Sequence, residues 1–177
     1  MILTAEYLTT AYDEFRNQDE KILDSKLNAL ELMIRKYTNN NFQNRNVRFS
    51  AESLGDRLLK VHPFLRVGDT VQITESKVND GLFVITEITD DFIRLDKKLL
   101  FNIPFNLVTK VEYPDDIKEG IINLLRYELT MRDKTGIKSE SISRHSVTYY
   151  DMNSENQVMG YPVSLFAFLT PYKKARF

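Results

Sequence analysis

The residues that most often bind metals or act as nucleophiles are scarce in this chain. The sequence has no cysteine and two histidines, His62 and His145. Neither histidine has a second histidine or a carboxylate at a recognisable metal-ligand spacing. His62 precedes a proline at the end of an expected strand, where a structural role is expected. His145 lies in a polar loop, where it is either solvated or part of an interface. We therefore expect neither a metal site nor a bound cofactor.

Two pairs of adjacent carboxylates, Asp90-Asp91 and Asp115-Asp116, are the remaining candidates for acid–base chemistry. Adjacent side chains do not converge on one point, so a turn and a helix start explain the two pairs better than catalysis does. The chain has no glycine-rich phosphate loop, nucleophile elbow or dinucleotide-binding motif. We expect a protein that is not an enzyme. The alternative, a small enzyme with a pocket between helices and strands, requires a cluster of shifted titratable groups.

The C-terminal end of the chain combines aromatic and basic residues after a proline. Its residues of interest are Tyr172, Lys173, Lys174, Arg176 and Phe177. A segment of this kind can dock into an acidic groove on a partner, with the aromatic rings as anchors and the arginine as a directional donor. A frayed terminus explains the same composition equally well.

Helical patterns occur at both ends of the chain. The central pattern runs over residues 23–42, with an apolar face that leaves Glu31 and Arg35 on the solvent side. Asp19 is the expected N-cap, and the asparagines after Thr38 are the expected stop. A shorter helix is expected over residues 3–15, a long one from Pro114 to just before Gly136, and a last one over residues 163–169.

Between these helices the pattern changes to alternation. Strands are expected over residues 58–62, 70–74, 82–88, 92–95 and 107–112, with a glycine turn at Asn79-Asp80-Gly81. Four phenylalanines are assigned to the core of this part: Phe83, Phe92, Phe101 and Phe105. The predicted fold class is α+β, an antiparallel helical bundle with a small inserted antiparallel β-barrel or sandwich. The predicted parts are residues 1–45 (helical), 46–113 (β module) and 114–177 (helical, with a polar loop and a docking tail).

Composition restricts the partners. The 177 residues are 42% hydrophobic and 28% charged, which describes a globular protein, and the net charge is -1. No segment is apolar enough to span a membrane, and the N-terminus lacks the features of a signal peptide, so we expect a cytoplasmic site of synthesis. The charge gives no positive field that would attract nucleic acid. A small nucleic-acid-binding module that uses the β part remains the alternative function.

Several motifs, each weak alone, occur in an order that resembles the head–tail connector, or adaptor, proteins of long-tailed bacteriophages. They are, in order along the chain, Tyr7 and Tyr12; residues 27–30 (LNAL) running into residues 34–40 (IRKYTNN); residues 138–149 (KSESISRHSVTY); residues 160–162 (GYP); and residues 169–177 (LTPYKKARF). Compact members of that family lack an insert like the one expected here, so its role does not follow from the resemblance.

The resemblance implies a structural virion assembly protein. Its copies would form a dodecameric ring beneath the portal, extend the DNA channel and offer a site for the next connector, stopper or tail protein. The C-terminal residues Tyr172, Lys173, Lys174, Arg176 and Phe177 would then contact the portal. The polar loop, with Ser139, Glu140, Arg144, His145 and Tyr149, would lie at subunit contacts, in the channel or against the next ring. Double-stranded DNA would pass without sequence-specific binding. The location would be the virion neck, and the host cytoplasm during assembly.

Overall fold

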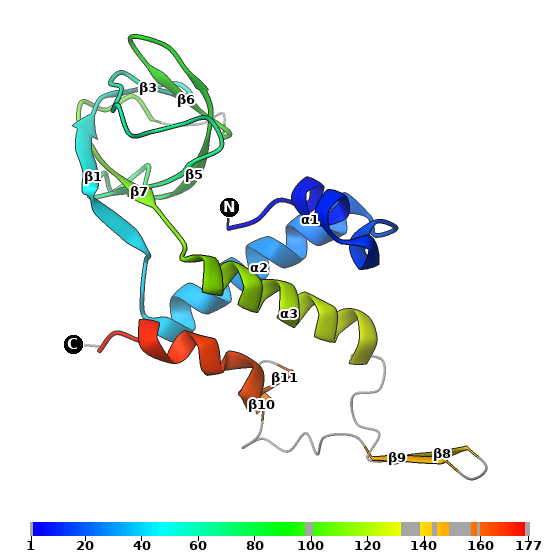
Figure 1. The fold of residues 1–177 in the computed structure, drawn as a ribbon. Helices are drawn as coiled ribbons and strands as arrows, with labels where there is room; N and C mark the ends of the chain where they lie inside the picture. Colours follow the sequence, from blue (N-terminus) through cyan, green and yellow to red (C-terminus); the bar gives the residue numbers. More distant parts are fainter. Residues whose placement is uncertain are drawn as a thin grey trace.

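The computed structural model describes residues 2–97, 101–131, 139–142, 145–148, 157–158 and 160–175. Figure 1 shows a curled β-sheet beside a group of helices. The last described residues, 173–175, lie at the C-terminal end of helix α2 (Glu20–Thr38). Two connecting segments join the sheet to the helices: residues 39–42 lead into β1, and residues 112–114 lead out of β7.

The N-terminal helices follow the predicted capping. Helix α1 spans Ala5–Ala11, a short 3-10 helix η1 spans Asp13–Phe15, and α2 spans Glu20–Thr38. The Asp19 carboxylate accepts hydrogen bonds from the backbone of Lys21 and Ile22, which confirms it as the N-cap. Asn39 adopts the left-handed conformation at φ 50° and ends the helix, as predicted.

The C-terminal half adds two further helices. Helix α3 spans Asp115–Met131 and 3-10 helix η3 spans Val163–Tyr172. Before η3, strands β10 (Gln157–Val158) and β11 (Tyr161–Pro162) form a short pair. The predicted last helix differs in type and end, because the 3-10 helix contains Pro171 and continues to Tyr172. One core joins α1, α2, α3 and η3. Its fully buried side chains include Leu8, Phe15, Leu27, Ile34, Ile117, Ile121, Phe166 and Leu169.

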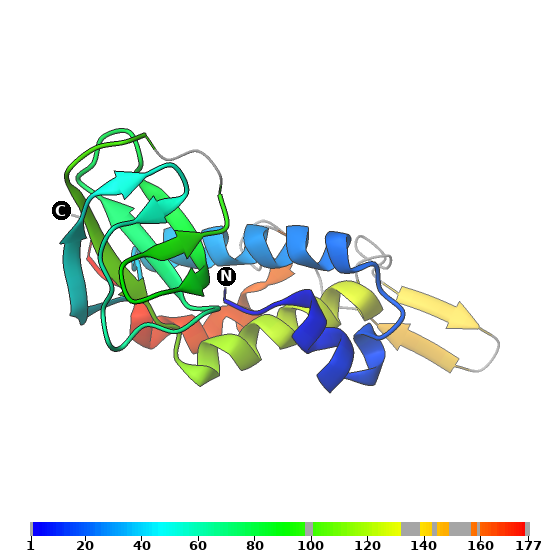
Figure 2. The same ribbon diagram turned by 90° about the horizontal axis from the view of Figure 1, so that it is seen from above.

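The sheet contains seven antiparallel strands. They are β1 (Gln43–Ala51), β2 (Ser53–Leu54), β3 (Arg57–Leu58), β4 (Thr70–Thr74), β5 (Gly81–Ile88), β6 (Ile93–Leu95) and β7 (Asn106–Val111). Their spatial order is β1-β7-β4-β5-β6-β3-β2. The first and last strands of this order are separated in the chain by Glu52 alone, so the sheet curls nearly into a barrel, as Figures 1 and 2 show. We refer to it below as the barrel. Its own core contains Leu58, Val71, Ile73, Ile85, Ile93 and Val108.

The predicted fold class, a helical bundle with a small inserted β module, is wrong. The structure is mostly β. A seven-stranded near-barrel encloses one hydrophobic core, and the helices pack around a second one. The β part begins at Gln43, directly after α2, because the polar residues 43–46 start the longest strand. These residues do not alternate between apolar and polar side chains, and half of this stretch is exposed. The sequence pattern therefore does not indicate a strand here.

Two finer predictions about the barrel are also wrong. Gly81 opens β5 and has no positive φ. The left-handed residues between β4 and β5 are Glu75 at φ 63° and Lys77 at φ 69°. Phe83 is buried as expected, but Phe101 and Phe105 are 65% and 48% exposed.

A second, isolated pair of strands follows α3. Strands β8 (Ser139–Ile142) and β9 (His145–Thr148) pair antiparallel, with Ser139 opposite Thr148 and Ile142 opposite His145. The polar stretch is compatible in sequence with an extended loop or a hairpin, and the pairing of β8 with β9 is that of a hairpin. Figures 1 and 2 both place the hairpin beyond the end of α3, away from the barrel and from η3. Among the described residues, no helix has the length and apolar character needed to cross a membrane.

Candidate functional site

The predicted docking residue Tyr172 is anchored in its own chain. Its hydroxyl donates to the Asp116 carboxylate, with the two oxygens at 2.8 and 2.7 Å, and its carbonyl accepts from Asn40 Nδ2 at 3.2 Å. Its ring lies 5.9 Å from that of Phe42, between ring centroids. The hydrogen bond to Asp116, helped by partial desolvation, raises the pKa of Tyr172. Tyr172 therefore fixes the end of η3 to the start of α3.

The next three residues, 173–175, pack against the C-terminal end of α2. Lys173 Nζ donates to the Tyr37 hydroxyl at 3.0 Å and lies 4.2 Å from the centre of that ring. The backbone N–H of Lys174 donates to the Thr38 carbonyl at 2.8 Å. Asn39 Nδ2 donates to the Ala175 carbonyl at 2.8 Å. These contacts, together with those of Tyr172, are called the C-terminal clamp below. Arg176 and Phe177 lie outside the described residues.

The sequence predicted Thr38 and the following asparagines as a helix stop, and they have a second role as partners of residues 172–175. The extra role comes from contacts across more than 130 positions in the chain, for which the local pattern carries no signal. The predicted docking residues within the clamp do not all make the same kind of contact. Tyr172 and Lys173 use their side chains internally, whereas Lys174 is exposed and uses its backbone.

Helix α2 carries a buried charged network at the joint between helices and barrel. Glu31 and Arg35 are 3% and 8% exposed, so their assignment to the solvent side is wrong. Arg35 Nη1 donates to the Asn41 carbonyl at 2.8 Å and to the Tyr113 hydroxyl at 3.2 Å, and Nη2 donates to Gln72 Oε1 at 2.8 Å. The Tyr113 hydroxyl donates to Glu31 Oε1 at 2.9 Å. We call Glu31, Arg35, Tyr113, Asn41 and Gln72 the charged network.

This network holds a phenol in its neutral form. Burial, and then the negative charge of Glu31, raise the pKa of Tyr113 well above its ordinary value, although Arg35 acts in the opposite direction. Because Gln72 belongs to β4, Tyr113 follows β7 and Arg35 belongs to α2, the network joins the barrel to the helices.

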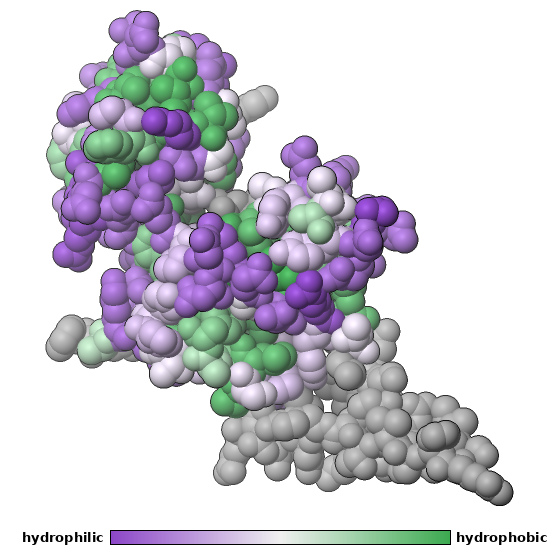
Figure 3. Space-filling view, in the orientation of Figure 1, coloured by the Kyte–Doolittle hydropathy of each residue, from purple (hydrophilic) through white to green (hydrophobic). Residues whose placement is uncertain are grey.

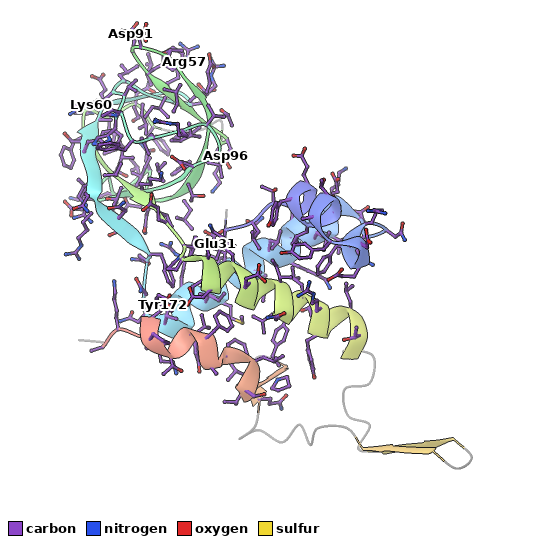
Figure 4. All side chains as sticks on the ribbon, in the orientation of Figure 1. Glu31, Arg57, Lys60, Asp91, Asp96 and Tyr172 are labelled. Carbon is purple, nitrogen blue, oxygen red and sulfur yellow. The ribbon has the colours of Figure 1, made fainter. Side chains whose placement is uncertain are left out.

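An open groove of about 710 Å³ lies between α2 and strands β4 and β5. Arg35 and Gln72 line it, together with Leu32 from the helix and Leu82 from the sheet. Figure 4 shows Glu31 on the helical side and Asp96, another lining residue, on the barrel side. The groove has charges of both signs. In the described part of the chain, no three or more His, Cys, Asp or Glu residues are grouped so that they could hold a metal ion.

The barrel contains a second buried network, formed by uncharged groups. Asn79 Nδ2 donates to Ser53 Oγ at 3.1 Å, to the Phe101 carbonyl at 2.9 Å and to Asn106 Oδ1 at 3.0 Å. Asn79 Oδ1 accepts from the Phe101 N–H at 2.8 Å. Asn106 Nδ2 donates to the Ala51 carbonyl at 3.0 Å. Ser53, Asn79 and Asn106 are 0%, 3% and 0% exposed. These three side chains and the backbone of Phe101 are called the neutral network.

The remaining candidates have structural roles. His62 stacks on Phe49 at 5.5 Å between centroids and 23° between planes, which supports the structural reading. Asp90 and Asp91 lie in the turn between β5 and β6, as predicted. Asp115 and Asp116 lie in the first turn of α3, also as predicted. The hydrogen bond from Lys118 lowers the pKa of Asp115.

The predicted loop residues form a second, separate region. Ser139 and Glu140 lie in β8 and His145 lies in β9, whereas Arg144 and Tyr149 lie outside the described residues. Figure 1 shows the hairpin beyond α3 and residues 172–175 near the opposite end of the helices. The structure therefore does not bring the two predicted sets of site residues together.

Comparison with known proteins leaves the family of this chain open. No protein-family model matches the sequence, and no curated protein sequence matches it.

Proposed function

We propose that this chain is a structural, non-enzymatic protein of a long-tailed bacteriophage, a head–tail connector or adaptor. Its copies form a ring beneath the portal, extend the channel for double-stranded DNA and provide the site where the next connector or the tail attaches. The resemblance of the ordered motifs at both ends of the chain is the basis of the proposal, and two features of the geometry support it.

The observation that carries the proposal is the C-terminal clamp. A frayed terminus was the alternative explanation of the aromatic and basic tail. Residues 172–175 are instead held by hydrogen bonds to Asn39, Asn40, Thr38 and Asp116. A segment that is ordered before it meets a partner loses less conformational entropy on binding. The clamp therefore holds residues 172–175 in one conformation, which suits a docking tail.

The β8–β9 hairpin agrees with assembly into a larger particle. A two-stranded hairpin is marginally stable in water unless a third strand, a helix or another surface packs on it. Figures 1 and 2 place β8 and β9 away from the barrel and from η3. In the proposed ring, the hairpin contacts a neighbouring copy or the next ring.

The first test is electron microscopy of DNA-filled, tail-less heads that carry the portal, incubated with the purified full chain. We expect a new ring of density beneath the portal. Heads that remain bare, although the added protein is folded and intact, would contradict the connector proposal.

A shortened chain tests the role of the tail. Removal of Arg176 and Phe177 leaves the clamp complete, because its last contact is at Ala175. We expect the thermal unfolding midpoint to stay within about 2 °C of that of the full chain, since no described contact is lost. We also expect attachment to heads to be lost. Attachment that persists at full strength would exclude these two residues as portal contacts.

The exposed phenylalanines of the barrel favour one alternative, a module that binds single-stranded nucleic acid. Phe64 and Phe101 are each 65% exposed, and exposed aromatic rings can stack on bases. Against it, Lys110 pairs with Asp69 and Glu112, so this cation is not available for phosphate. Binding to single-stranded DNA that weakens steeply with added salt would favour this alternative over the connector.

A further inference from the structure

The neutral network supports an exposed apolar patch on the barrel. Its three buried polar residues each stand next to a large, exposed apolar residue in the sequence, and its fourth member, Phe101, is itself such a residue. Ser53 adjoins Leu54, Asn79 adjoins Val78, and Asn106 adjoins Phe105, while Phe101 belongs to the network through its backbone. The exposed fractions are 50% for Leu54, 52% for Val78, 65% for Phe101 and 48% for Phe105. These four side chains are called the barrel patch.

The patch is held rigidly by buried hydrogen bonds. Strand β2, the loop between β4 and β5 and the loop between β6 and β7 carry it. The Asn79 amide joins these segments, because it bonds to Ser53, to Asn106 and to both backbone groups of Phe101. Isolated exposed apolar residues are normal on a protein surface, but a group of them on a preorganised support is typical of an interaction site. Figure 3 shows that apolar residues do gather on the visible face of the barrel.

The charges beside the patch are mostly acidic. The exposed charged residues described in the same loops or next to the patch in sequence are Glu52, Glu75, Asp80 and Asp96, against Lys77 and Lys97. A partner surface should therefore be apolar and flanked by basic groups. The majority of carboxylates favours such a protein surface over a nucleic acid, whose phosphates they would repel.

Helix α2 presents a surface with this complementary chemistry. Ile22 and Leu32 are 58% and 53% exposed. Ile22, Ala29, Leu32 and Lys36 follow one another at helical spacing and share a face. On the helix itself, the exposed charges at this face are Lys21 and Lys36, both basic. Leu32 and Lys36 also line the groove described above, where Asp96 lies on the barrel side. We call it the exposed α2 face. Since both surfaces stay exposed in one chain, they do not cover each other within a copy.

We infer that the barrel patch of one copy docks on the exposed α2 face of a second copy of this chain. The inference rests on the proposed ring, of which it names one interface. Two different surfaces meet in such a contact, and a contact of this heterologous kind builds a ring when its rotation closes. Phe101 and Phe105 supply the apolar anchors, and the flanking carboxylates face Lys21 and Lys36.

A photo-crosslinking amino acid tests the contact directly. We place p-benzoylphenylalanine at Phe101 of the full chain and, as a matched control, at Phe64, which is equally exposed at 65% and is not part of the neutral network. Both proteins are irradiated in concentrated solution and on portal-bearing heads. We expect the probe at position 101 to join two copies, with the linked peptide from residues 20–38, and the probe at position 64 to give no such product.

Three results would overturn the inference: no copy-to-copy product from position 101 in either setting, products with another protein only, or equal yields from both positions. Heads that carry a ring without this product overturn the interface and leave the proposed function intact. Copy-to-copy products in solution, with heads that stay bare, support the interface and contradict the proposed function.

Substitutions give a second, independent measurement. Phe101→Ser should weaken association between copies by about tenfold or more, as expected for an interface anchor, whereas Phe64→Ser should leave it unchanged. Glu52→Lys should weaken it by up to about fivefold, and Lys21→Glu in the same chain should restore it. Equal effects of the two serine variants, or a charge swap without restoration, would contradict the proposed contact.

Discussion

Two buried polar networks differ in their chemistry and in what they connect. The charged network joins α2 to β4 and to Tyr113 through an arginine, a carboxylate and a phenol. The neutral network joins strands β2 and β7 to two loops of the barrel through amide and hydroxyl groups. A buried charge loses much more hydration than a buried amide, so removing one partner costs more in the charged network. The comparison shows that the joint between helices and barrel depends on charge balance, whereas the barrel patch depends on hydrogen-bond geometry.

The largest effect is expected from Arg35→Met. The substitution leaves Glu31 buried without its cationic neighbour and removes the donor to Gln72 and Asn41. We expect a loss of about 3–5 kcal/mol in the free energy of unfolding, the range for leaving a buried charge uncompensated. Urea titration measures it. The control is Arg48→Met, which removes an exposed arginine with hydrogen bonds to Thr109 and Gln43. Similar losses in the two variants would contradict a special role of charge at the joint.

Asn79→Ala should have a smaller and more local effect. It removes the amide that joins Ser53, Asn106 and the backbone of Phe101, so we expect a loss of about 1–3 kcal/mol, the cost of leaving buried polar groups unpaired. Amide hydrogen exchange should become faster at Phe101, because its N–H loses its acceptor. Asn102→Ala, at an exposed neighbour, is the matched control. Unchanged exchange at Phe101 would show that the amide does not hold the patch.

The charged network should also respond to alkaline pH, unlike the neutral one. The pKa of Tyr113 is raised in the folded state, so its phenol stays neutral there, while in the unfolded state it ionises near its ordinary value of about 10. The contribution of Tyr113 to the free energy of unfolding is thus fully present below about pH 10 and is lost as the pH rises further. The pKa of Lys110 is raised as well, because its hydrogen bonds to Asp69 and Glu112 outweigh the opposing effect of burial, so this group changes stability in the same direction.

Tyr113→Phe isolates the contribution of Tyr113 from those of Lys110, Tyr172 and Tyr12, whose pKa values are raised as well. The difference in unfolding free energy between the wild type and the variant should shrink as the pH rises above about 10, because the wild type alone loses the Tyr113 contribution. Urea titrations at pH 8 to 11 measure this difference, with Asn79→Ala as the variant whose difference from the wild type stays constant. A constant difference for Tyr113→Phe would contradict the assignment of the alkaline response to the charged network.

The smallest effect is expected at the C-terminal clamp, where similar hydrogen bonds lie at the surface. Tyr172→Phe removes the hydroxyl that bonds to Asp116, and water can replace it. We expect less destabilisation than for Asn79→Ala, with faster amide exchange at Lys174. A loss of stability larger than that of Asn79→Ala would show that the clamp belongs to the core of the fold.

The local features of the helices could be predicted from sequence, because caps and periodic apolar faces depend on neighbouring residues. Asp19 and Asn39 cap α2 as expected, and β4 has the expected bounds, Thr70–Thr74. The fold class could not be predicted, since β1 begins with polar residues that become a strand only by pairing with β7. The long-range pairing supplies the information that the pattern lacks.

The two networks were missed for a similar reason. Glu31 and Arg35 read as solvent-facing because charged residues on the polar side of a helix usually are exposed. Their burial depends largely on partners far along the chain, Tyr113 and Gln72. Ile2 and Asn41 supply further hydrogen bonds. Phe101 and Phe105 read as core residues because they are large and apolar. The amide of Asn79 instead fixes the loop so that both face solvent. One signal was present: Ser53, Asn79 and Asn106 each adjoin a large apolar residue, a pattern that is compatible with polar residues pointing inward.

Cryo-electron microscopy of DNA-filled heads with the bound full chain tests the central claim most directly. The account predicts a ring of identical copies beneath the portal, with residue 175 of every copy on the portal side and each barrel patch against the α2 helix of a neighbour. Heads without added density, or protein bound along released DNA in place of a ring, would contradict it.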